Sequence, residues 1–290
     1  MFSSYVSPSL RLAACLLAVL CAPAAIAMTV QHNVVYAERD GQALKGELYL
    51  PDGAGPHPVL VAVHGGGWKY ADASFYSHWG PYLAHHGYAL FAINYRLVHG
   101  KDKLYPAAPD DARAALGFVR RQAAALHLDD NRLGLIGDSA GAQIAALAAL
   151  TDEGKPRLKA LVGIYGIYDM AAQWQDDHAH RPDDDIVGDY LGTTPQQAPA
   201  LYADASPLMQ IHAGAGSPAV LLVWGTRDDR VDSKAQSKAF LKALQDKGYA
   251  AQALVMQGAP HYWASDPIKP GKNYPGYLAP RLLHFLEQSL

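Results

Sequence analysis

The sequence predicts an α/β fold in which helices cover both faces of a mostly parallel sheet. Two observations lead to this class. Short apolar runs alternate with stretches of helical character over roughly 230 residues, and most of these runs are apolar almost without interruption, as in strands buried on both faces. The 290-residue chain is also half hydrophobic, which suffices for one large core in a single domain.

The expected strands follow one another at intervals that leave room for crossover helices. The first, 46–51, alternates apolar and polar residues and is predicted to be half-buried. The others are the apolar runs 58–66, 89–96, 132–139, 159–166, 219–225 and 251–258. Right-handed crossovers between such strands produce a doubly wound sheet.

Helices are predicted between these strands and at the end of the chain. Residues 107–126 carry Asp110 and Asp111 near their start, and the negative charges of these residues suit the first turn of a helix. Residues 233–247 begin at a serine and end before a glycine, which is typical of a C-terminal cap. Residues 277–290 are predicted to form a closing helix.

One segment interrupts this alternation, from residue 169 to about residue 218. It is rich in Asp, Pro, Gln and Ala and contains no run that resembles a buried strand. Long insertions of this kind lie on the surface and often carry function. We therefore expect a small cap-like insertion that crosses the upper edge of the sheet.

Residues 1–27 are predicted to be a signal peptide. Arg11 is the only basic side chain before an apolar run, and the small residues Ala25 and Ala27 fit an A-x-A cleavage site. The run is too short for a convincing membrane span, so cleavage after Ala27 would leave a secreted or periplasmic protein without one. A lipoprotein-like Leu-Ala-Ala-Cys at 12–15 lacks a preceding apolar stretch and is the weaker alternative.

Composition excludes several other classes of function. Cys15 and Cys21 both lie in the predicted signal peptide, so the mature chain would have no disulfide, cysteine nucleophile or cysteine-ligated metal. The net charge of −3 is spread without long runs of one sign. This distribution argues against nucleic acid and against a polybasic membrane-binding surface.

A candidate nucleophile, Ser139, lies at the end of the predicted strand 132–139. The pentapeptide GDSAG fits G-x-S-x-G, in which Gly137 and Gly141 permit a tight turn that raises the serine hydroxyl at the sheet edge. An ordinary strand-to-helix turn is the alternative, because short turns of glycine and serine are common.

Three consecutive glycines follow an earlier predicted strand, in the sequence HGGGW from His64 to Trp68. No side chains cover their backbone N–H groups. Acyl transfer needs such hydrogen-bond donors for the oxygen that becomes negative in the tetrahedral intermediate. The N–H of Ala140, at the start of a helix, is a further candidate donor. A flexible loop selected for its turn geometry is the alternative.

Two late strands supply candidate partners for the serine. The sequence LLVWGTRDDRVD offers Asp228, Asp229 and Asp232, and His261 follows the next strand in QGAPHYW. The chain order serine, acid, histidine fits a nucleophile, an orienting carboxylate and a general base. In that mechanism the neutral imidazole takes the serine proton and later gives it to the leaving group.

The motifs HGGGW, NYRL, YPAAPDDARAAL, GDSAG, WGTRDDRV and GAPHYW resemble, in order and approximate spacing, those of a known family. They are similar to the α/β-hydrolase esterases of the hormone-sensitive-lipase and bacterial feruloyl-esterase type. The resemblance covers roughly residues 45–290 and implies an α/β-hydrolase fold for residues 28–290. The compact branch of feruloyl esterases and kynurenine formamidases looks closer, because this chain lacks a long N-terminal cap.

The resemblance also implies roles for individual residues. It selects Asp228 over Asp229 as the triad acid, and it implies Gly66, Gly67 and Ala140 as oxyanion donors. Two departures, a Trp-Gly pair where the family usually has His-Gly and a proline before the catalytic histidine, remove no catalytic atom.

Other residues receive mostly structural interpretations. Asp111 is expected to place a negative charge near the N-terminus of a helix. Asp138 is expected to point away from the imidazole of His261. The histidines at 85–86 and at 178 and 180 lack metal-ligand spacing, so neither a metal nor another cofactor is expected. Of the aromatic residues near the predicted catalytic loops, Trp68 and Tyr262 are expected to line the cleft. The others in this group are Tyr95, Tyr165, Tyr168, Trp174 and Trp263.

Together these features predict a serine hydrolase that cleaves a small-molecule carboxylic ester through an acyl-enzyme intermediate. Ser139 would attack the carbonyl, His261 would act as base and then acid, and Asp228 would orient the imidazole. An amidase or peptidase, for example one similar to an arylformamidase, uses the same side chains and is the closest alternative. A non-catalytic binding protein on a hydrolase scaffold is a further alternative, although such proteins usually lack a triad member.

Overall fold

The computed structural model describes residues 1–2, 28–100, 104–152, 154, 157–212 and 216–290. Apart from its first two residues, the predicted signal peptide lies outside these ranges, so its cleavage site stays a prediction. Within them, we find no helix whose length and hydropathy would let it span a bilayer.

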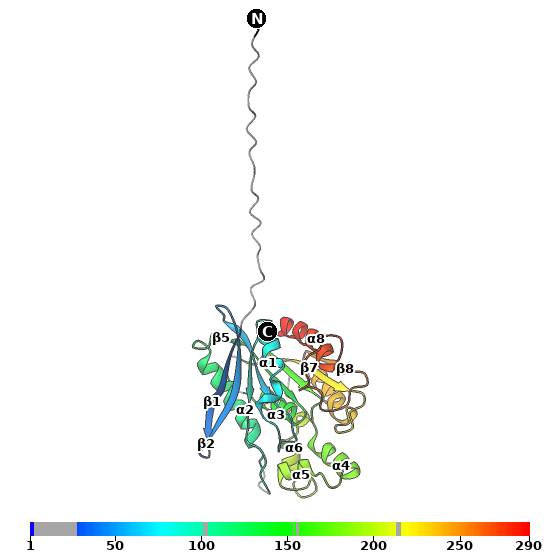
Figure 1. Ribbon diagram of the computed structural model, residues 1–290. Coiled ribbons are helices and arrows are strands. Elements are labelled where there is room, and N and C mark those ends of the chain that lie inside the picture. The colour runs from blue at the N-terminus through cyan, green and yellow to red at the C-terminus, as the bar shows by residue number, and fades with distance from the viewer. Residues whose placement is uncertain (3–27, 101–103, 153, 155–156, 213–215) are drawn as a thin grey trace.

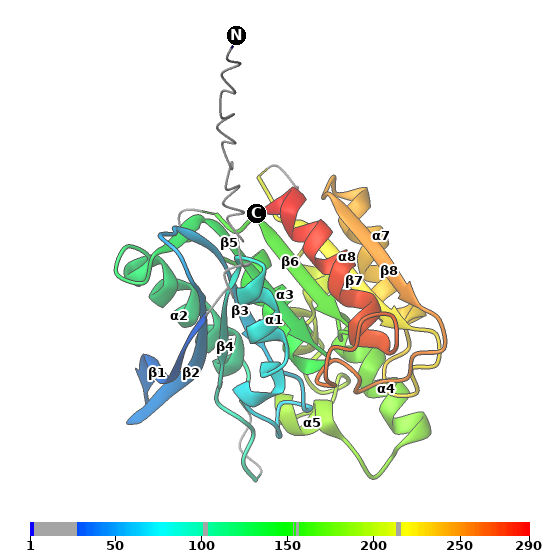
Figure 2. The same cartoon turned by 45° about the horizontal axis from the view of Figure 1, so that its top comes forward.

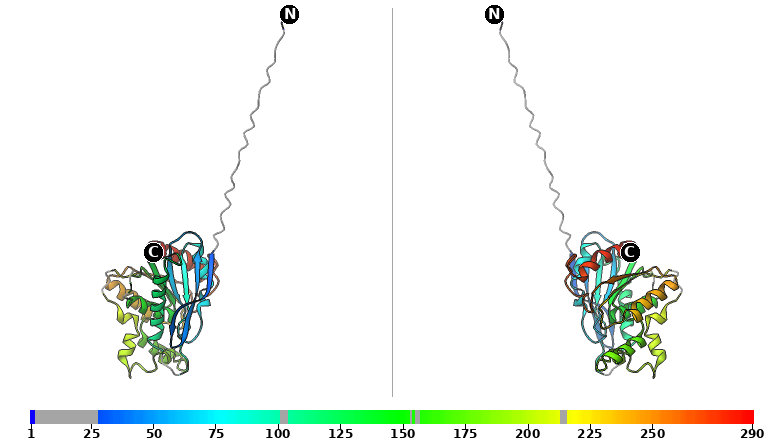
Figure 3. Two further views of the ribbon diagram at one scale, coloured as in Figure 1. Left: turned by 90° about the vertical axis from the view of Figure 1, so that its left-hand side faces the viewer. Right: turned by 90° about the vertical axis from the view of Figure 1, so that its right-hand side faces the viewer.

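An eight-stranded sheet runs through the described residues in the order β1-β2-β4-β3-β5-β6-β7-β8 (Figures 1 and 2). β2 pairs antiparallel with both β1 and β4, and the remaining neighbours are parallel. The β1–β2 hairpin and β8 lie at opposite edges (Figure 3). The strands are β1 Met28–Arg39, β2 Gln42–Pro51, β3 His57–Val63, β4 Ala89–Ile93, β5 Leu128–Asp138, β6 Ala160–Ile164, β7 Ala219–Gly225 and β8 Ala251–Met256. The predicted mostly parallel sheet is confirmed.

Helices cover both faces of this sheet, as the sequence predicts. α1 (Trp79–His85) and α8 (Tyr274–Ser289) pack on one face, and α2 (Ala107–Gln122), α3 (Ala140–Leu150) and α7 (Ala239–Asp246) pack on the other. Successive strand residues point to opposite faces, so Leu60 and Val61 of β3 belong to two different cores. Burial of both strand faces explains why the central strands are apolar almost throughout.

Some boundaries and two elements differ from the sequence prediction. The sequence does not predict β1. Its side chains are mostly exposed or half-buried and its pairing with β2 is irregular at two places, so it leaves no regular apolar pattern. α1 has only seven residues, too few to show a clear helical period. The helix predicted at 107–126 ends at Gln122, and the one predicted at 233–247 opens with a π-helical turn, Lys234–Lys238.

The segment between β6 and β7 contains short helices and, among its described residues, no strand. They are α4 Met170–His180, α5 Ile186–Leu191, α6 Pro199–Asp204 and a 3-10 turn, Pro207–Gln210. Figure 2 shows α4 and α5 beyond the carboxyl ends of the central strands. This is the segment for which the sequence predicts a cap-like insertion, and its position brings α4 to the loops that follow β5, β7 and β8.

Two glycines allow the chain to turn from β5 into α3 at very close range. A Cβ atom on Gly137 would lie 2.3 Å from the carbonyl oxygen of Gly141. A Cβ atom on Gly141 would lie 2.1 Å from the carbonyl oxygen of Val63 in β3. Both distances are far below van der Waals contact, so the approach of α3 to the sheet requires glycine at each position.

This contact predicts opposite effects for two glycine-to-alanine substitutions. Gly141→Ala should lower the free energy of unfolding by about 2 kcal/mol or more, because the new methyl group meets rigid backbone. Gly117→Ala on α2 should be neutral or stabilising by about 0.5–1 kcal/mol, because a helical glycine gains propensity there. Its Cβ would meet only the end of the flexible Arg121 side chain. Urea unfolding of both variants measures this, and equal stabilities would refute the contact.

Candidate active site

Ser139 occupies the turn between β5 and α3 in a strained backbone conformation. Its φ is 50° and its ψ is −123°, a backbone conformation that residues other than glycine rarely adopt. Its N–H donates to the carbonyl of Ile164 in β6 (2.9 Å), which fixes the turn to the sheet. The tight turn expected from G-x-S-x-G is therefore present, and it exposes the hydroxyl to the cavity described below.

His261 connects Ser139 to Asp228 through two hydrogen bonds. Nε2 of the imidazole lies 2.9 Å from Ser139 Oγ, and Nδ1 lies 2.8 Å from Asp228 Oδ2. An ionised carboxylate can only accept, so Nδ1 donates to it and Nε2 is left to accept from the serine hydroxyl. The side chains of His261 and Asp228 are almost completely buried. The structure thus brings together the three residues that the sequence places far apart.

The second carboxylate oxygen of Asp228 selects this residue over its neighbours. Asp228 Oδ1 accepts from the backbone N–H groups of Arg230 and Val231, both at 2.9 Å. Asp232 instead accepts from the N–H of Lys234 (3.0 Å), at the start of the following helix. Because both oxygens of Asp228 are engaged, its carboxylate is held in one orientation toward the imidazole.

The expected oxyanion donors lie beside the serine. Gly66 and Gly67 line the same cavity as Ser139, and both have positive φ values, 106° and 58°. A Cβ on Gly66 would lie 2.3 Å from the carbonyl oxygen of Tyr70, so this loop closes only with glycine. Ala140 is the first residue of α3, where the helix leaves backbone N–H groups without an internal partner. The amides of Gly66, Gly67 and Ala140 remain the predicted oxyanion donors, and the structure places these residues next to Ser139 or in the wall of the same cavity.

A buried carboxylate, Asp138, holds the glycine loop in place. Its Oδ1 accepts from the N–H of Gly65 (3.0 Å) and from the hydroxyl of Tyr76 (3.2 Å), so it points away from the imidazole as expected. Burial raises the pKa of Asp138 to about 7, although these two hydrogen bonds oppose the shift. Asp138, the residue before Ser139, therefore supports the glycine loop.

The loop is also fixed by the aromatic packing of His64. The imidazole stacks on Tyr95 at 4.4 Å between ring centres, and the Tyr95 hydroxyl donates to the His64 carbonyl (3.0 Å). Burial lowers the pKa of His64 to about 4, so this ring is neutral at physiological pH. The first residue of HGGGW is therefore a neutral structural side chain.

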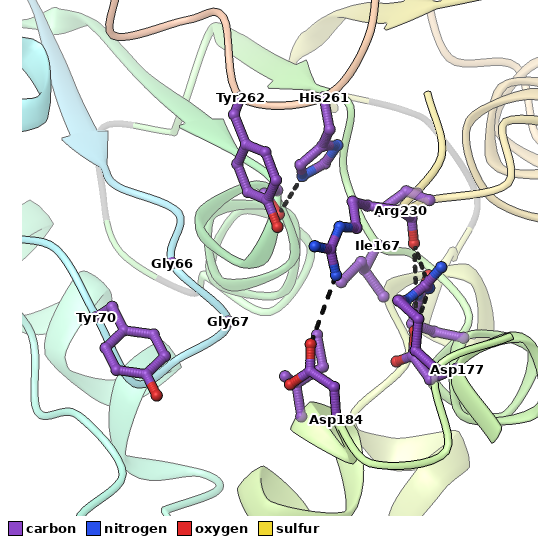
Figure 4. A pocket seen from close by; sticks show the side chains of 14 residues that line it. Gly66, Gly67, Tyr70, Ile167, Asp177, Asp184, Arg230, His261 and Tyr262 are labelled. Atoms are coloured by element: carbon purple, nitrogen blue, oxygen red, sulfur yellow. Dashed lines mark hydrogen bonds and ion pairs between the residues drawn. The ribbon is translucent and has the colours of Figure 1, made fainter. Parts of the chain in front are cut away.

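Ser139 and His261 open into a cavity of about 260 Å³ at the carboxyl edge of the sheet (Figure 4). Its apolar wall includes Ile167, Ile186 and Val231, and its polar wall comes largely from the segment between β6 and β7. The lining residues are Gly66, Gly67, Tyr70, Ser139, Ile167, Gln173, Asp177, Arg181, Asp184, Ile186, Arg230, Val231, His261 and Tyr262.

One of the two aromatic residues expected at the cleft is there and the other is not. Tyr262 lines the cavity and is 60 % exposed. The prediction that Trp68 lines the cleft is wrong, because this residue is fully buried in the core and absent from the cavity wall. Its indole N–H donates to Gln143 of α3 (3.0 Å), and its ring stacks on Tyr190 of α5 at 4.5 Å. Trp68 follows the glycine loop and anchors it beneath the surface.

Asp111 and the histidines considered as metal ligands lie outside the site or have structural partners. Asp111 is buried at the start of α2 and forms an ion pair with Arg96 (2.7 Å). His178 stacks on Trp174, while His180 lies 3.1 Å from the carboxylate of Asp176. The described residues contain no cluster of His, Cys, Asp and Glu able to hold a metal ion.

Sequence reasoning missed the polar residues that α4 and its end contribute. Gln173 Nε2 donates to the carbonyl of Arg230 (2.9 Å), and Arg181 donates to the carbonyls of Asp229 (2.8 Å) and Arg230 (2.9 Å). Arg181 also forms an ion pair with the buried Asp177. These bonds tie the inserted segment to the loop that carries Asp228. The spacing of four residues from Gln173 to Asp177 and again to Arg181 indicates one helix face, but not what that face contacts.

Comparisons with known proteins find a family model and relatives that are named as esterases. A family model described as BD-FAE matches residues 47–244. An ethyl acetate hydrolase from Pseudomonas putida is 32 % identical over 241 residues, covering 77 % of this chain and 72 % of that protein. A probable isoprenylcysteine alpha-carbonyl methylesterase from Oryza sativa subsp. japonica is 29 % identical over 267 residues. That match covers 84 % of this chain, which spans 60 % of the length of the relative.

Solved structures share the fold. Carboxyl esterase 2 from Tuber melanosporum superposes with a TM-score of 0.74 at 23 % identity, covering 92 % of this chain and 89 % of that one. The likeness extends over nearly the whole described sheet and its helices.

The buried Asp138 predicts a pH-dependent contribution to stability. Its carboxyl group binds a proton up to about pH 7 in the folded protein, against an ordinary value of 3.8 in an unfolded chain. Its contribution is therefore fully present below pH 3.8 and is lost as pH rises through about 7. Asp138→Asn should remove this loss, so the variant should gain stability relative to wild type between pH 4.5 and 7.5.

Chemical denaturation at both pH values measures this difference. Asp246→Asn, at an exposed carboxylate that pairs with Lys242 on α7, is the matched control. A gap between wild type and Asp138→Asn that is the same at both pH values would contradict the prediction.

Proposed function

Because the chain belongs to the BD-FAE family of α/β-hydrolase esterases, we propose that it hydrolyses small-molecule carboxylic esters through an acyl-enzyme intermediate. The observation that carries this proposal is the hydrogen-bonded series from Ser139 through His261 to Asp228 at the wall of one cavity. Relatives named as an ethyl acetate hydrolase and a methylesterase support the same bond type.

Acylation would begin with attack of Ser139 Oγ on the ester carbonyl carbon while His261 Nε2 takes the hydroxyl proton. Asp228 stabilises the resulting imidazolium through the hydrogen bond at Nδ1. The carbonyl oxygen becomes negative and binds the amides of the glycine loop and of Ala140. Collapse breaks the bond to the alcohol oxygen, which takes the proton from Nε2 and leaves.

Deacylation would repeat these steps with water as the nucleophile. Nε2 takes a proton from the water, whose oxygen attacks the acyl carbon, and Ser139 Oγ leaves with the proton that Nε2 returns. The products are one carboxylic acid and one alcohol, and the enzyme is restored. No step needs a group other than the triad, the amides and water.

The cavity favours small substrates. Its volume of about 260 Å³ lies just below the usual range for sites that bind drug-sized molecules. Its apolar and polar walls would divide the acyl and alcohol parts of the ester between them. We therefore expect short esters, such as acetates and butyrates, to be the preferred substrates.

Ser139→Ala should lower kcat by about four orders of magnitude or more, because the remaining amides catalyse only weakly without the nucleophile. Release of 4-nitrophenol from the acetate and butyrate esters measures the effect. Ser74→Ala, at an exposed position of the 3-10 turn Ala73–Tyr76, is the matched control and should retain full turnover.

Two further measurements separate the proposal from its alternatives. Covalent labelling by a fluorophosphonate should occur in wild type and disappear in Ser139→Ala, whereas a binding protein would not be labelled. A kcat/KM for 4-nitroanilides above that for the matching esters would favour an amidase instead. Retention of esterase activity within tenfold in Ser139→Ala would falsify the assignment of the nucleophile.

We also infer that the protein is exported and acts in the periplasm or outside the cell. The pattern of residues 1–27, with Arg11 before the apolar run and an A-x-A site ending at Ala27, supports this inference. Both cysteines of the chain lie in that segment, so export would leave a thiol-free enzyme. N-terminal sequencing of the protein from the periplasm or medium should begin at Met28. Recovery from the cytoplasm with residues 1–27 intact would contradict it.

A further inference from the structure

Arg230 lines the cavity of Ser139 and His261 on a backbone that is fixed from both sides. Its N–H donates to Asp228 Oδ1 (2.9 Å). Its carbonyl accepts from Gln173 Nε2 and Arg181 Nη2, both at 2.9 Å. The side chain therefore extends from a well-defined position beside the triad rather than from a mobile loop.

The guanidinium group of Arg230 has few partners of its own. Among the described residues it makes two interactions, an ion pair with Asp184 Oδ2 at 3.5 Å and a contact over the ring of Tyr262 at 5.8 Å (Figure 4). The ion-pair distance exceeds that of a good charge-assisted hydrogen bond. A guanidinium carries five N–H donors, so most of those on Arg230 have no protein acceptor within the described part of the chain.

The second arginine of the cavity differs in this respect. The guanidinium of Arg181 forms ion pairs with Asp176 and Asp177 and donates to two backbone carbonyls. Its donors are committed to holding the inserted segment against the acid loop. Of these two cations, Arg230 is therefore the one with donors left for a ligand.

The carboxylate of Asp184 shows where a carboxylate group can form an ion pair with Arg230. It comes from the turn between α4 and α5, lines the same cavity, and is 55 % exposed. Ion pairs as exposed as this one contribute little to stability, because water screens them and both side chains lose freedom. A carboxylate on the substrate could take this position while Asp184 turns toward solvent.

We propose that Arg230 is a specificity-determining residue that binds a carboxylate carried by the ester substrate. This inference rests on the proposed esterase activity and names its substrate class, a monoester of a dicarboxylic acid. The planar guanidinium can bind both carboxylate oxygens in parallel, with the Tyr262 ring behind it. The binding energy would orient the ester carbonyl toward Ser139 Oγ.

The test compares charged and neutral esters of the same acyl carbon number. Monoethyl succinate, glutarate and adipate are paired with ethyl butanoate, pentanoate and hexanoate, and ethanol release gives kcat/KM for each. The three lengths sample the separation of the two carboxyl groups. For at least one pair, the charged-to-neutral ratio of kcat/KM in wild type should fall by about tenfold or more in Arg230→Gln. Glutamine keeps the backbone N–H and carbonyl that hold the acid loop.

Two further arms make the outcome specific. Asp184→Asn removes the competing carboxylate and should raise the same ratio, and added salt should lower it in wild type. Arg39→Gln, at an exposed arginine on β1 that donates only to the neighbouring carbonyl of Glu38 among the described residues, should leave the ratio unchanged.

The possible failures are distinguishable. If wild type hydrolyses the neutral ethyl esters but Arg230→Gln leaves the ratio unchanged at every length, the role of Arg230 is wrong and the esterase activity stands. A ratio that falls in Arg230→Gln and also falls in Asp184→Asn would mean that the two side chains act as a structural pair, and this too overturns the proposal. Absence of hydrolysis for all six esters and for the nitrophenyl esters would remove both inferences.

Discussion

The strained turn at Ser139 is the constraint on which the rest of the site depends. A positive φ at a serine costs free energy, and it persists only because the flanking structure leaves no alternative. α3 lies so close to β3 that Gly141 has no room for a Cβ atom, and the sheet fixes the turn through the Ser139 N–H. Packing of one helix on a parallel sheet thus determines where the hydroxyl points. The histidine and acid loops need only reach the same edge.

The glycine loop and the acid loop are held by polar contacts in addition to the packing of Trp68 and His64. Asp138 supports the glycine loop from below, and Asp228 is held by two backbone amides of its own turn. The inserted segment adds a third support through Gln173 and Arg181, which bind the carbonyls of the acid loop. Both loops are therefore held in place without a ligand, and such preorganisation would reduce the reorganisation that the proposed reaction requires.

The parts of this architecture that depend on local pattern could be predicted from the sequence. Central strands buried on both faces give unmistakable apolar runs, and the triad residues follow strands whose carboxyl ends must share one edge. Features that depend on distant partners could not be predicted. β1 is an edge strand without alternation, and Trp68 is buried because Gln143 and Tyr190 happen to meet it. Much of the polar wall of the cavity comes from α4 and the turn that follows it, whose sequence does not indicate which loop they contact.

The bonds from Gln173 and Arg181 to the acid loop have a consequence for how molecules enter and leave. A lid that swung away as a rigid body would have to break these bonds or carry the backbone around Asp228 with it. Either movement would disturb the loop that holds the carboxylate of Asp228 against His261. The exposed side chains of Tyr70 and Tyr262 line the same cavity, and their rotation would break none of these bonds. A molecule that enters past these two side chains would meet His261 and Asp228 with their hydrogen bond already formed.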